Sequence, residues 1–522
     1  MPGRGAMTGA STRSGTGDPV RSLRTAWTGF RRARGRVAAT AAGALAVVLL
    51  GLASAAGSHT SCSAGAVEVA CPALPVGPGG EAVEDKFFFV HRALTGDGGI
   101  TARVTSLTGV IRKPDAVPGV RNVVAGVVPW AKAGVMVKES IEQGSSYAAV
   151  MVTGAHGVRM QHDFTHDVAG RPGGVSEGSP RWLRLVRSGD TLIGYESADG
   201  AHWSEVGTAR LPGLQATVEI GLFAASPGDL TVTPGALGGS ASRFSEATAA
   251  FDRVTLEGGT AGGEWREDDV GVTGEPGGSP HHPGRTSESG GAFSVTGNGD
   301  IAPSTGGQTL ERTLVGLPAG LIAVIVVAVM SATAEHRYGL GRTAPPARPR
   351  RGRVPAAGAA VVAAVAFAAG LAATAVTLTA GSRILRANGN QVLPVSWLTE
   401  VRVVVGTAAL FAVAAVLSFA LGVLFRRGTG AIPAAVALIV LPHLLATVSV
   451  LPDSAAQWLL RVTPAAGFAI QQSIPQYAHV LGHYAPSAGF YPLAPWAGLG
   501  VLTAWAAVAL LGCGWLLRRR DV

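Results

Sequence analysis

Residues 314–334 read LVGLPAGLIAVIVVAVMSATA, an uncharged run that ends where Glu335 begins a charged segment. A helix needs about 20 apolar residues to cross a hydrocarbon core about 30 Å thick. The run shows no alternation of polar and apolar residues, which argues against the strand of a closed barrel. It therefore predicts a transmembrane helix.

Five further runs share this length and composition, at 37–56, 354–378, 403–425, 431–450 and 493–517. The chain is predicted to be a polytopic α-helical membrane protein with six transmembrane helices. The first span occupies 37–57 and the other five lie within 313–522. The long segment between spans one and two is predicted to be a soluble insert.

Arginine distinguishes the two sides of the predicted membrane. Short cytoplasmic loops are rich in Lys and Arg, which predicts a plasma-membrane protein with both termini in the cytoplasm and residues 58–312 outside. The cytoplasmic set is Arg4, Arg13, Arg21, Arg24, Arg31, Arg32, Arg34, Arg36, Arg337, Arg342, Arg348, Arg350, Arg351, Arg353, Arg426, Arg427, Arg518, Arg519 and Arg520. The short outer loops hold only Arg383, Arg386, Arg402 and Arg461.

The net charge of +9 conceals an uneven distribution, because the insert is acidic and the remainder is strongly basic. The basic excess fits orientation against anionic cytoplasmic lipid. No basic patch with interleaved aromatic residues stands on the soluble part, so the sequence argues against a nucleic-acid partner.

The N-terminal segment 1–36 is predicted to be a cytoplasmic tail with an interfacial helix. Val20, Leu23, Trp27 and Phe30 recur at helical spacing with arginines between them, a pattern typical of amphipathic helices at a membrane surface. The alternative is a secretory signal cleaved after the small residues 53–55. The length of the basic region and of the apolar run favours a retained helix.

The cysteines agree with this topology. Cys62 and Cys71 follow the first span closely, and two cysteines in an oxidising space predict a disulfide. Metal binding by this pair needs further ligands, and only His59 is near. Cys513 lies within the last span and is interpreted as a small apolar residue.

The insert is predicted to be all-β over 58–257. Short strand-like runs alternate with turn residues, as in a sandwich or jelly roll. Asp199-Gly200 is a turn signal, and 188–190 predicts a hairpin. Residues 258–312 are rich in Gly, Ser, Pro and acidic residues, which predicts a mostly flexible tether with one short strand-like run at 292–295.

The insert resembles the concanavalin A-like jelly rolls that accompany secreted glycosidases. The resemblance rests on the segments 130–137, 182–185, 194–203, 220–224 and 250–254. Within it Tyr195 and Trp203 are candidates for stacking on a sugar; the alternative is that they pack the hairpin. Such a fold does not by itself imply a ligand.

Two further hypotheses for the insert, glycoside hydrolysis and metal binding, have little support in the sequence. Glycoside hydrolysis needs a pair of carboxylates about 5–9 Å apart, and the E-x-D-x-E strand pattern is missing. The acidic cluster 264–269 falls in the predicted tether. The second hypothesis is a metal site, for which the candidate ligands are His156, His162, Asp163, His166 and Asp167. Two histidines at positions i and i+4 suit a helix, but these residues lie in predicted strands and loops. No metal site is therefore predicted.

The membrane part resembles the permease subunit of actinobacterial ABC-2-type transporters. The segments that carry this resemblance are 27–31, 333–343, 349–353, 394–402, 463–468 and 518–521. The family implies six spans, an interfacial helix before the first, and a loop after span two that docks on the ATPase. The candidate coupling residues are Glu335, Arg337, Gly339 and Arg342, although prolines after Thr343 depart from the helix that relatives carry there.

The chain is not expected to hydrolyse ATP itself. A P-loop needs a glycine-rich turn ending in Gly-Lys, and none of Lys86, Lys113, Lys132 and Lys138 follows a glycine. The resemblance therefore implies a separate ATPase subunit that binds the nucleotide, a second permease copy or homologue, and no cofactor on this chain. The alternative function is a membrane-anchored carbohydrate-binding or receptor protein without transport activity.

The segment between spans five and six and a histidine within span five each leave two interpretations open. The segment 453–492 is rich in Trp, Tyr, His and Pro, which suits a substrate gate or an interfacial aromatic belt. His443 beside Pro442 lines a pathway or packs against a helix kink.

Overall fold

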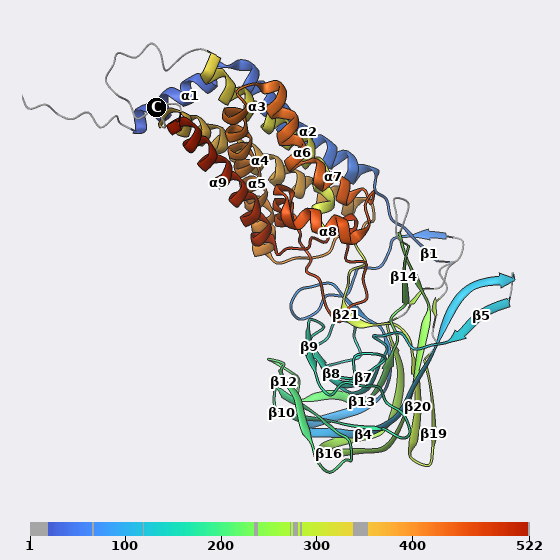
Figure 1. The fold of residues 1–522 in the computed structure, drawn as a ribbon. Coiled ribbons are helices and arrows are strands. Elements are labelled where there is room, and N and C mark those ends of the chain that lie inside the picture. Colours follow the sequence, from blue (N-terminus) through green and yellow to red (C-terminus); the bar gives the residue numbers. More distant parts are fainter. Residues whose placement is uncertain are drawn as a thin grey trace, which may run out of the picture.

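A computed structural model describes residues 19–64, 67–117, 120–233, 239–271, 273–274, 280–281, 284–337 and 353–519. Figure 1 shows two parts placed end to end, a bundle of helices and a β domain. The β domain is inserted between the first and second long helices of the bundle, as predicted.

The helices of the bundle follow the apolar runs of the sequence. Among the described residues, six candidate spans are long and apolar enough to cross a membrane. Five are single helices, and the sixth is α6 and α7 together, because Pro442 in the first turn of α7 cannot donate a backbone hydrogen bond to α6. The bounds are α1 (Pro19–Arg32), α2 (Arg34–Gly57), α3 (Leu317–Arg337), α4 (Arg353–Ala387), α5 (Trp397–Phe425), α6 (Gly428–Ile439), α7 (Leu441–Thr447), α8 (Asp453–Val462) and α9 (Pro495–Arg519).

Helices α2 and α3 approach each other closely through small residues. A Cβ atom on Gly320 would lie 2.4 Å from the Val47 side chain, so only glycine permits this crossing. Such small residues are typical of helix contacts in membranes. Val47 is fully buried, and α2 continues to Gly57 without interruption. The first span is thus an integral part of the bundle, which favours the retained helix over the cleaved signal.

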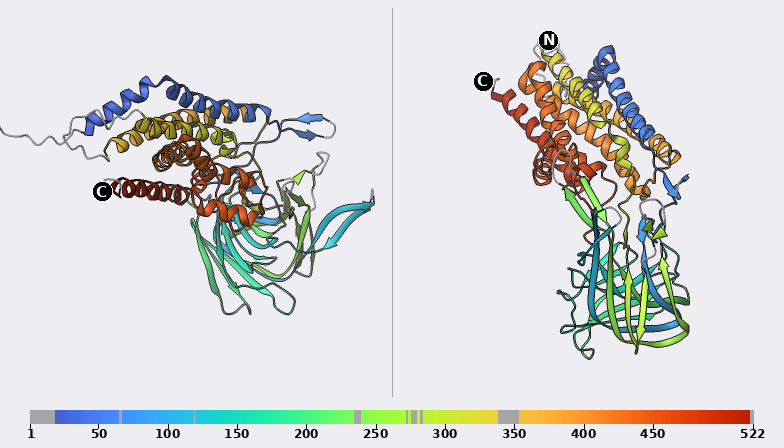
Figure 2. Two further views of the ribbon diagram at one scale, coloured as in Figure 1. Left: turned by 45° about the horizontal axis from the view of Figure 1, so that its top comes forward. Right: turned by 90° about the vertical axis from the view of Figure 1, so that its right-hand side faces the viewer.

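The predicted amphipathic helix before the first span is present as α1. Phe30 is buried against the bundle, whereas Val20, Leu23 and Trp27 are exposed. Helix α1 and the end of α9 both lie at the end of the bundle remote from the β domain (Figures 1 and 2).

The β domain is built on one large sheet whose main path runs β12-β11-β10-β4-β13-β6-β7-β8-β9. Strand β4 also pairs with β16 and β5, and β16 pairs with β20, which pairs with β19. The strands of this sheet are β4 (Phe87–Val117), β5 (Val120–Ala125), β6 (Lys132–Lys138), β7 (Tyr147–Thr153), β8 (Val158–His162), β9 (His166–Ala169), β10 (Arg181–Ser188), β11 (Thr191–Ser197), β12 (Ser204–Arg210), β13 (Thr217–Ala225), β16 (Ser245–Val270), β19 (Arg285–Ser289) and β20 (Ala292–Gly297).

Shorter pairs join the large sheet to the helices and loops around it. They are β1 (Cys62–Ala64) with β2 (Val67–Val69), β3 (Val83–Asp85) with β21 (Ile301–Pro303), β14 (Asp229–Thr233) with β15 (Gly239–Arg243), and β17 (Thr273–Gly274) with β18 (Pro280–His281). The all-β prediction for 58–257 is therefore confirmed, and the strand-like runs at 86–90 and 100–106 belong to the single long strand β4.

The sheet folds back on itself to enclose a core. Leu183 and Leu185 of β10 share this core with Val135 of β6 and Val150 of β7. On β11, a Cβ atom at Gly194 would lie 2.4 Å from Val150, so glycine allows the layers to close. The result is the predicted β sandwich.

The prediction of a mostly flexible tether at 258–312 was wrong for most of the residues that the structure describes, although the strand-like run at 292–295 is a strand, β20. Strand β16 continues to Val270, and β20 covers the core with Phe293 and Val295. Register shifts in β16 fall at Gly258 and Gly262, where bulges bend the strand. The glycines that suggested a flexible linker therefore bend a long paired strand.

The acidic cluster expected in that tether is likewise part of β16. The Asp268 carboxylate lies 2.8 Å from Nε2 of His91, whose Nδ1 lies 2.6 Å from Glu219. Arg266 pairs with Glu219 at 2.8 Å. These four residues form a network across β4, β13 and β16, whereas Glu264 and Glu267 of the acidic cluster are exposed.

Candidate functional site at the β-facing end of the bundle

The end of the bundle that meets the β domain is called the β-facing end here. The chain passes between the two parts twice, after α2 and before α3, and the loop between α4 and α5 holds both connections. Asn390 accepts hydrogen bonds from the hydroxyls of Ser58 at 2.9 Å and Thr60 at 2.8 Å. The backbone N–H of Gln308 donates to the Gln391 carbonyl at 2.8 Å.

Asn388 strengthens this attachment by capping the end of α2. Its side-chain amide donates to the carbonyls of Ala55, Ala56 and Ser58 at 3.2–3.3 Å. The last carbonyls of a helix have no partner within it, so these bonds satisfy them. The β domain is thus fixed to α4 and α5 through side chains as well as through the chain itself.

A short 3-10 helix, η2 (Pro464–Gln471), returns into the bundle after α8, and all of its residues are buried. It packs between α5 and α9, where a Cβ atom on Gly467 would lie 2.9 Å from Leu502 and 3.0 Å from Leu410. The Phe468 ring stacks on His443 with centroids 3.7 Å apart. Irregular backbone at this depth is tolerated only inside protein or beside water.

Beside η2, a polar cluster joins the three segments that meet here. Glu311 of η1 (Leu310–Leu314) accepts hydrogen bonds from the hydroxyl and, at 3.2 Å, the backbone N–H of Ser473. Burial raises the pKa of Glu311, and the bonds from Ser473 oppose that shift. Arg402 donates to the Gln472 carbonyl at 2.8 Å, and its Nη1 has no hydrogen-bond partner among the described residues.

Tyr491 closes the other side of this cluster. Its hydroxyl accepts a hydrogen bond from Gln471, and its backbone N–H donates to Gln472 at 3.1 Å. Burial raises the pKa of Tyr491. The arrangement places a carboxyl, a guanidinium and several amide groups where the bundle meets the β domain.

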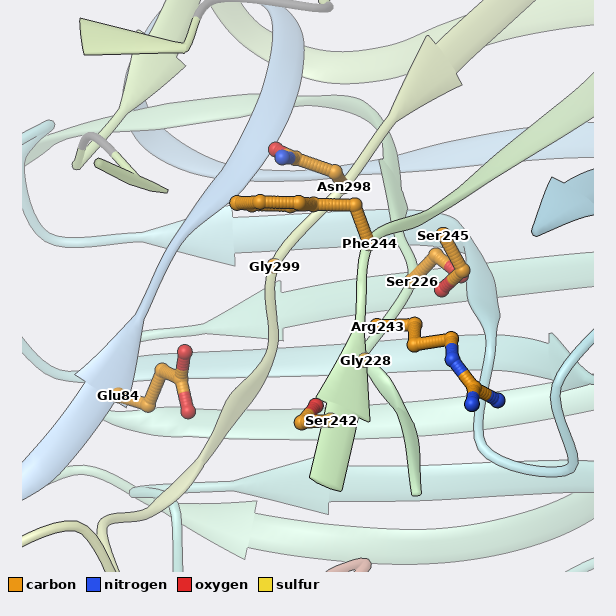
Figure 3. A pocket seen from close by; sticks show the side chains of 9 residues that line it. All are labelled: Glu84, Ser226, Gly228, Ser242, Arg243, Phe244, Ser245, Asn298 and Gly299. Carbon is orange, nitrogen blue, oxygen red and sulfur yellow. The ribbon is translucent and has the colours of Figure 1, made fainter. Parts of the chain in front are cut away.

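Two adjoining cavities lie above this cluster. The larger, about 410 Å³, is lined from both parts of the molecule, with Glu84 and Asp300 from the β domain and Arg312, Ile474 and Tyr484 from the β-facing end. The smaller, about 250 Å³, lies within the β domain (Figure 3). Glu84, Gly228 and Ser242 line both, so the two are neighbours.

Two of the four residues predicted for ATPase coupling lie at the opposite end of the bundle. Glu335 and Arg337 belong to the last turn of α3. Gly339 and Arg342 lie outside the described residues. The coupling role therefore stays a prediction.

The predicted disulfide is confirmed, because Cys62 and Cys71 are bonded and tie β1 to the segment that follows β2. Cys513 is free and buried, as expected.

The two residues proposed for sugar stacking are both half-buried on the outer face of the domain. Tyr195 pairs in register with Arg184, and the Arg184 guanidinium lies 5.6 Å from the centre of the Trp203 ring. Arg184 also forms an ion pair with Glu257. This packing supports the structural interpretation of Trp203.

The three histidines considered for a metal site do not come together, although two of them are in contact. His162 and His166 stack with centroids 4.2 Å apart, and burial lowers the pKa of His162 to about 4. His156 stacks on Trp130 instead, at 4.0 Å. Asp167 is engaged by Arg159. Within the described ranges no group of three or more His, Cys, Asp or Glu side chains is placed to hold a metal.

Sequence reasoning overlooked Glu311 and did not connect His479 to the insert. Glu311 lies at the end of the segment predicted to be a tether. The only feature of the sequence that could have indicated its role is its place, as an acidic residue just before a transmembrane span. His479 was noted only as part of an aromatic segment. The Nε2 atom of His479 lies 2.8 Å from the Phe164 carbonyl of the β domain, a contact that no local pattern reveals.

Comparisons with known proteins give little beyond this geometry. No family model matches the chain, and no curated protein matches it. Among solved structures, scytalido-glutamic peptidase with a transition state analog inhibitor is similar at 9% identity, covering 41% of this chain and 98% of that chain with a TM-score of 0.26. A functionally unknown protein from Saccharomyces cerevisiae matches at 17% identity, 37% and 84% coverage, and a TM-score of 0.21. TM-scores this low carry no argument about function.

Proposed function

We propose that this chain is the membrane-spanning subunit of an ATP-driven exporter of the ABC-2 type, energised by a separate ATPase. The observation that carries the proposal is the buried segment η2 with its polar cluster at the β-facing end of a bundle of six candidate spans. A surface anchor needs one span and has no use for a re-entrant segment. A carboxyl whose pKa is raised by burial, here Glu311, is a candidate for a functional group.

The two ends of the bundle take different roles in this proposal. The end with α1, the last turn of α3 and the end of α9 is rich in arginine, which assigns it to the cytoplasm. The opposite end carries the disulfide and the β domain, which suits an oxidising exterior. The ATPase then contacts the segment after α3, and solute leaves beside η2.

ATP hydrolysis is assigned to a partner because no lysine of this chain follows a glycine, so the chain has no P-loop. The bundle must then receive mechanical work through a surface at its cytoplasmic end. The family resemblance also implies a second copy of the permease or a homologue. Concanavalin A-like architecture for the β domain belongs to the same proposal.

Purification of the tagged full-length chain from its native membrane tests the proposal. In a mild detergent we expect a second polypeptide that contains a P-loop, identified by mass spectrometry, and ATP hydrolysis that vanadate inhibits. A mock purification from untagged cells is the control. Recovery of the chain alone, without ATP hydrolysis, in several mild detergents and in nanodiscs would contradict the proposal.

A further inference from the structure

The segment between η2 and α9 contacts the β domain through His479. The side chain of His479 is buried in this contact, unlike the side chains of an ordinary surface loop. His479 is 3% exposed, and its Nε2 lies 2.8 Å from the Phe164 carbonyl. Its ring meets Trp130 edge to face at 6.4 Å and Tyr477 at 6.0 Å. A side chain from the bundle is therefore buried in the β domain.

We propose that His479 and Phe164 form a latch that holds the wall of the larger cavity closed and that releases in acid. This inference rests on the proposed transport function for its purpose. The latch itself is a property of the chain and can be tested without any partner.

The β-domain side of the latch is held in an unusual conformation. Phe164 has φ 62° and Asp163 before it has φ 44°, both in the left-handed region that bulky residues rarely adopt. The Phe164 ring is fully buried and packs edge to face on Tyr147, with centroids 5.0 Å apart. Backbone of this kind persists only where surroundings enforce it, and it gathers at functional sites.

The latch controls one wall of the larger cavity. Ile474 and Val480, on either side of His479 in the chain, both line that cavity. The same segment is fixed at its start by Ser473 on Glu311. Release of His479 therefore frees the middle of the segment while its start stays attached, which moves the cavity wall and leaves η2 in place.

The charge surroundings of His479 make the contact sensitive to protonation. Burial lowers the pKa of His479 from its ordinary value of 6.5, and the Lys132 cation lowers it further. The Phe164 carbonyl, Asp167 and Asp300 act in the opposite direction, and burial is the largest cause. Lys132 and Asp300 form an ion pair at 2.6 Å, and Asp167 is bound by Arg159, so much of their charge is compensated.

The sign of the pH dependence follows from this lowered pKa. A histidine whose pKa is lower in the closed latch than in the open one favours the closed latch while it is neutral. The contact is at full strength above the ordinary pKa of about 6.5. It weakens as the pH falls below that value, because the open form then binds more protons.

Hydrogen exchange of the full-length chain in nanodiscs tests the latch. For wild type we expect peptides covering 474–482 and 163–166 to exchange faster at pH 5.5 than at pH 7.5, after correction for the intrinsic rate. One net hydrogen bond predicts a change of about fivefold. His479→Gln should exchange fast at both pH values.

His483→Gln is the matched control, because His483 lies in the same segment but contacts Asp453, at 3.2 Å. It should keep the wild-type pH response. The inference is overturned if corrected wild-type exchange is the same at both pH values, or if His483→Gln removes the response as fully as His479→Gln. Since no ATPase takes part, failure here is distinguishable from failure of the proposed transport function.

Discussion

The helix bundle and the β domain differ in the kind of polar side chain that they bury. In the β domain, two fully buried lysines have carboxylate partners, Lys132 with Asp300 at 2.6 Å and Lys138 with Asp85 at 2.8 Å. In the bundle, the buried polar side chains are of types such as Thr407 and His443, and among the described residues no Asp, Glu, Lys or Arg of its α-helices is buried.

This difference bears on how firmly each part is held in one arrangement. A buried charge is tolerated only when its partner is present, so a buried ion pair favours a single arrangement of the residues around it. We therefore expect the β domain to behave as a fixed body, and the handling of a solute by the bundle stays part of the proposed function.

The largest expected effect concerns which residues the β domain needs in order to fold. Residues 58–307, produced without the helices, should fold cooperatively, whereas residues 58–257 should not. The shorter fragment lacks β20 and the half of β16 that pairs with the start of β4. Burial of Phe293 and Val295 alone contributes about 1.5–3 kcal/mol each.

Circular dichroism and denaturant unfolding of the two fragments provide the measurement. Both keep the Cys62–Cys71 disulfide, so its contribution cancels. If fragment 58–257 unfolds cooperatively at the same denaturant concentration as fragment 58–307, residues 258–303 are a linker and not part of the folded domain.

The next effect concerns the buried charges. Lys138→Met should lower the free energy of unfolding of fragment 58–307 by about 3–5 kcal/mol, because it leaves Asp85 buried without its cation. Lys138 also donates to the Ser145 carbonyl at 3.1 Å, a bond that methionine cannot replace. Equilibrium urea unfolding measures the change.

Lys113→Met is the matched control for this substitution. Lys113 pairs with Asp229 at 3.1 Å, but 33% of its side chain is exposed. Exposed pairs contribute about 0–1 kcal/mol, so the control should change stability little. Equal losses in the two variants would remove the contrast between buried and surface charges.

A smaller effect is expected where the two parts join. Asn390→Ala removes hydrogen bonds to Ser58 and Thr60 and should loosen the attachment by about 1–3 kcal/mol. Hydrogen exchange of peptides covering 57–61 in the full-length chain should rise accordingly. Gln391→Ala, which removes one side-chain bond to the Pro72 carbonyl, is the milder control. If Asn390→Ala leaves exchange at 57–61 unchanged, the join does not depend on these side chains.

The bundle was predictable from sequence because hydropathy alone determines which segments can lie in lipid. All six predicted spans coincide with candidate spans of the structure. The exception is the break within the fifth, where 431–450 suggested one helix and Pro442 divides it into α6 and α7. The predicted strands before residue 257 were also found, because short strand-like runs that alternate with turn residues are a local feature of the sequence.

The remaining features depend on contacts between distant residues. The second half of β16 has a glycine-rich sequence and becomes a strand only because β4 lies beside it. Glu311 and Ser473 are 162 positions apart, and His479 and Phe164 are 315 apart. No local period or composition identifies such pairs, so the candidate site at the β-facing end could not be assembled from the sequence.

Charge reversal at the end of α3 tests the central claim, that a separate ATPase drives this bundle from the end remote from the β domain. Glu335→Lys should reduce co-purification of the ATPase and its stimulated hydrolysis by tenfold or more, since an interfacial charge left unpaired costs about 2–5 kcal/mol. Glu400→Lys makes the same charge change in the exposed first turn of α5, at the β-facing end, and should leave both unchanged. Undiminished co-purification and hydrolysis in Glu335→Lys, in membranes that contain the wild-type amount of the chain, would contradict the account.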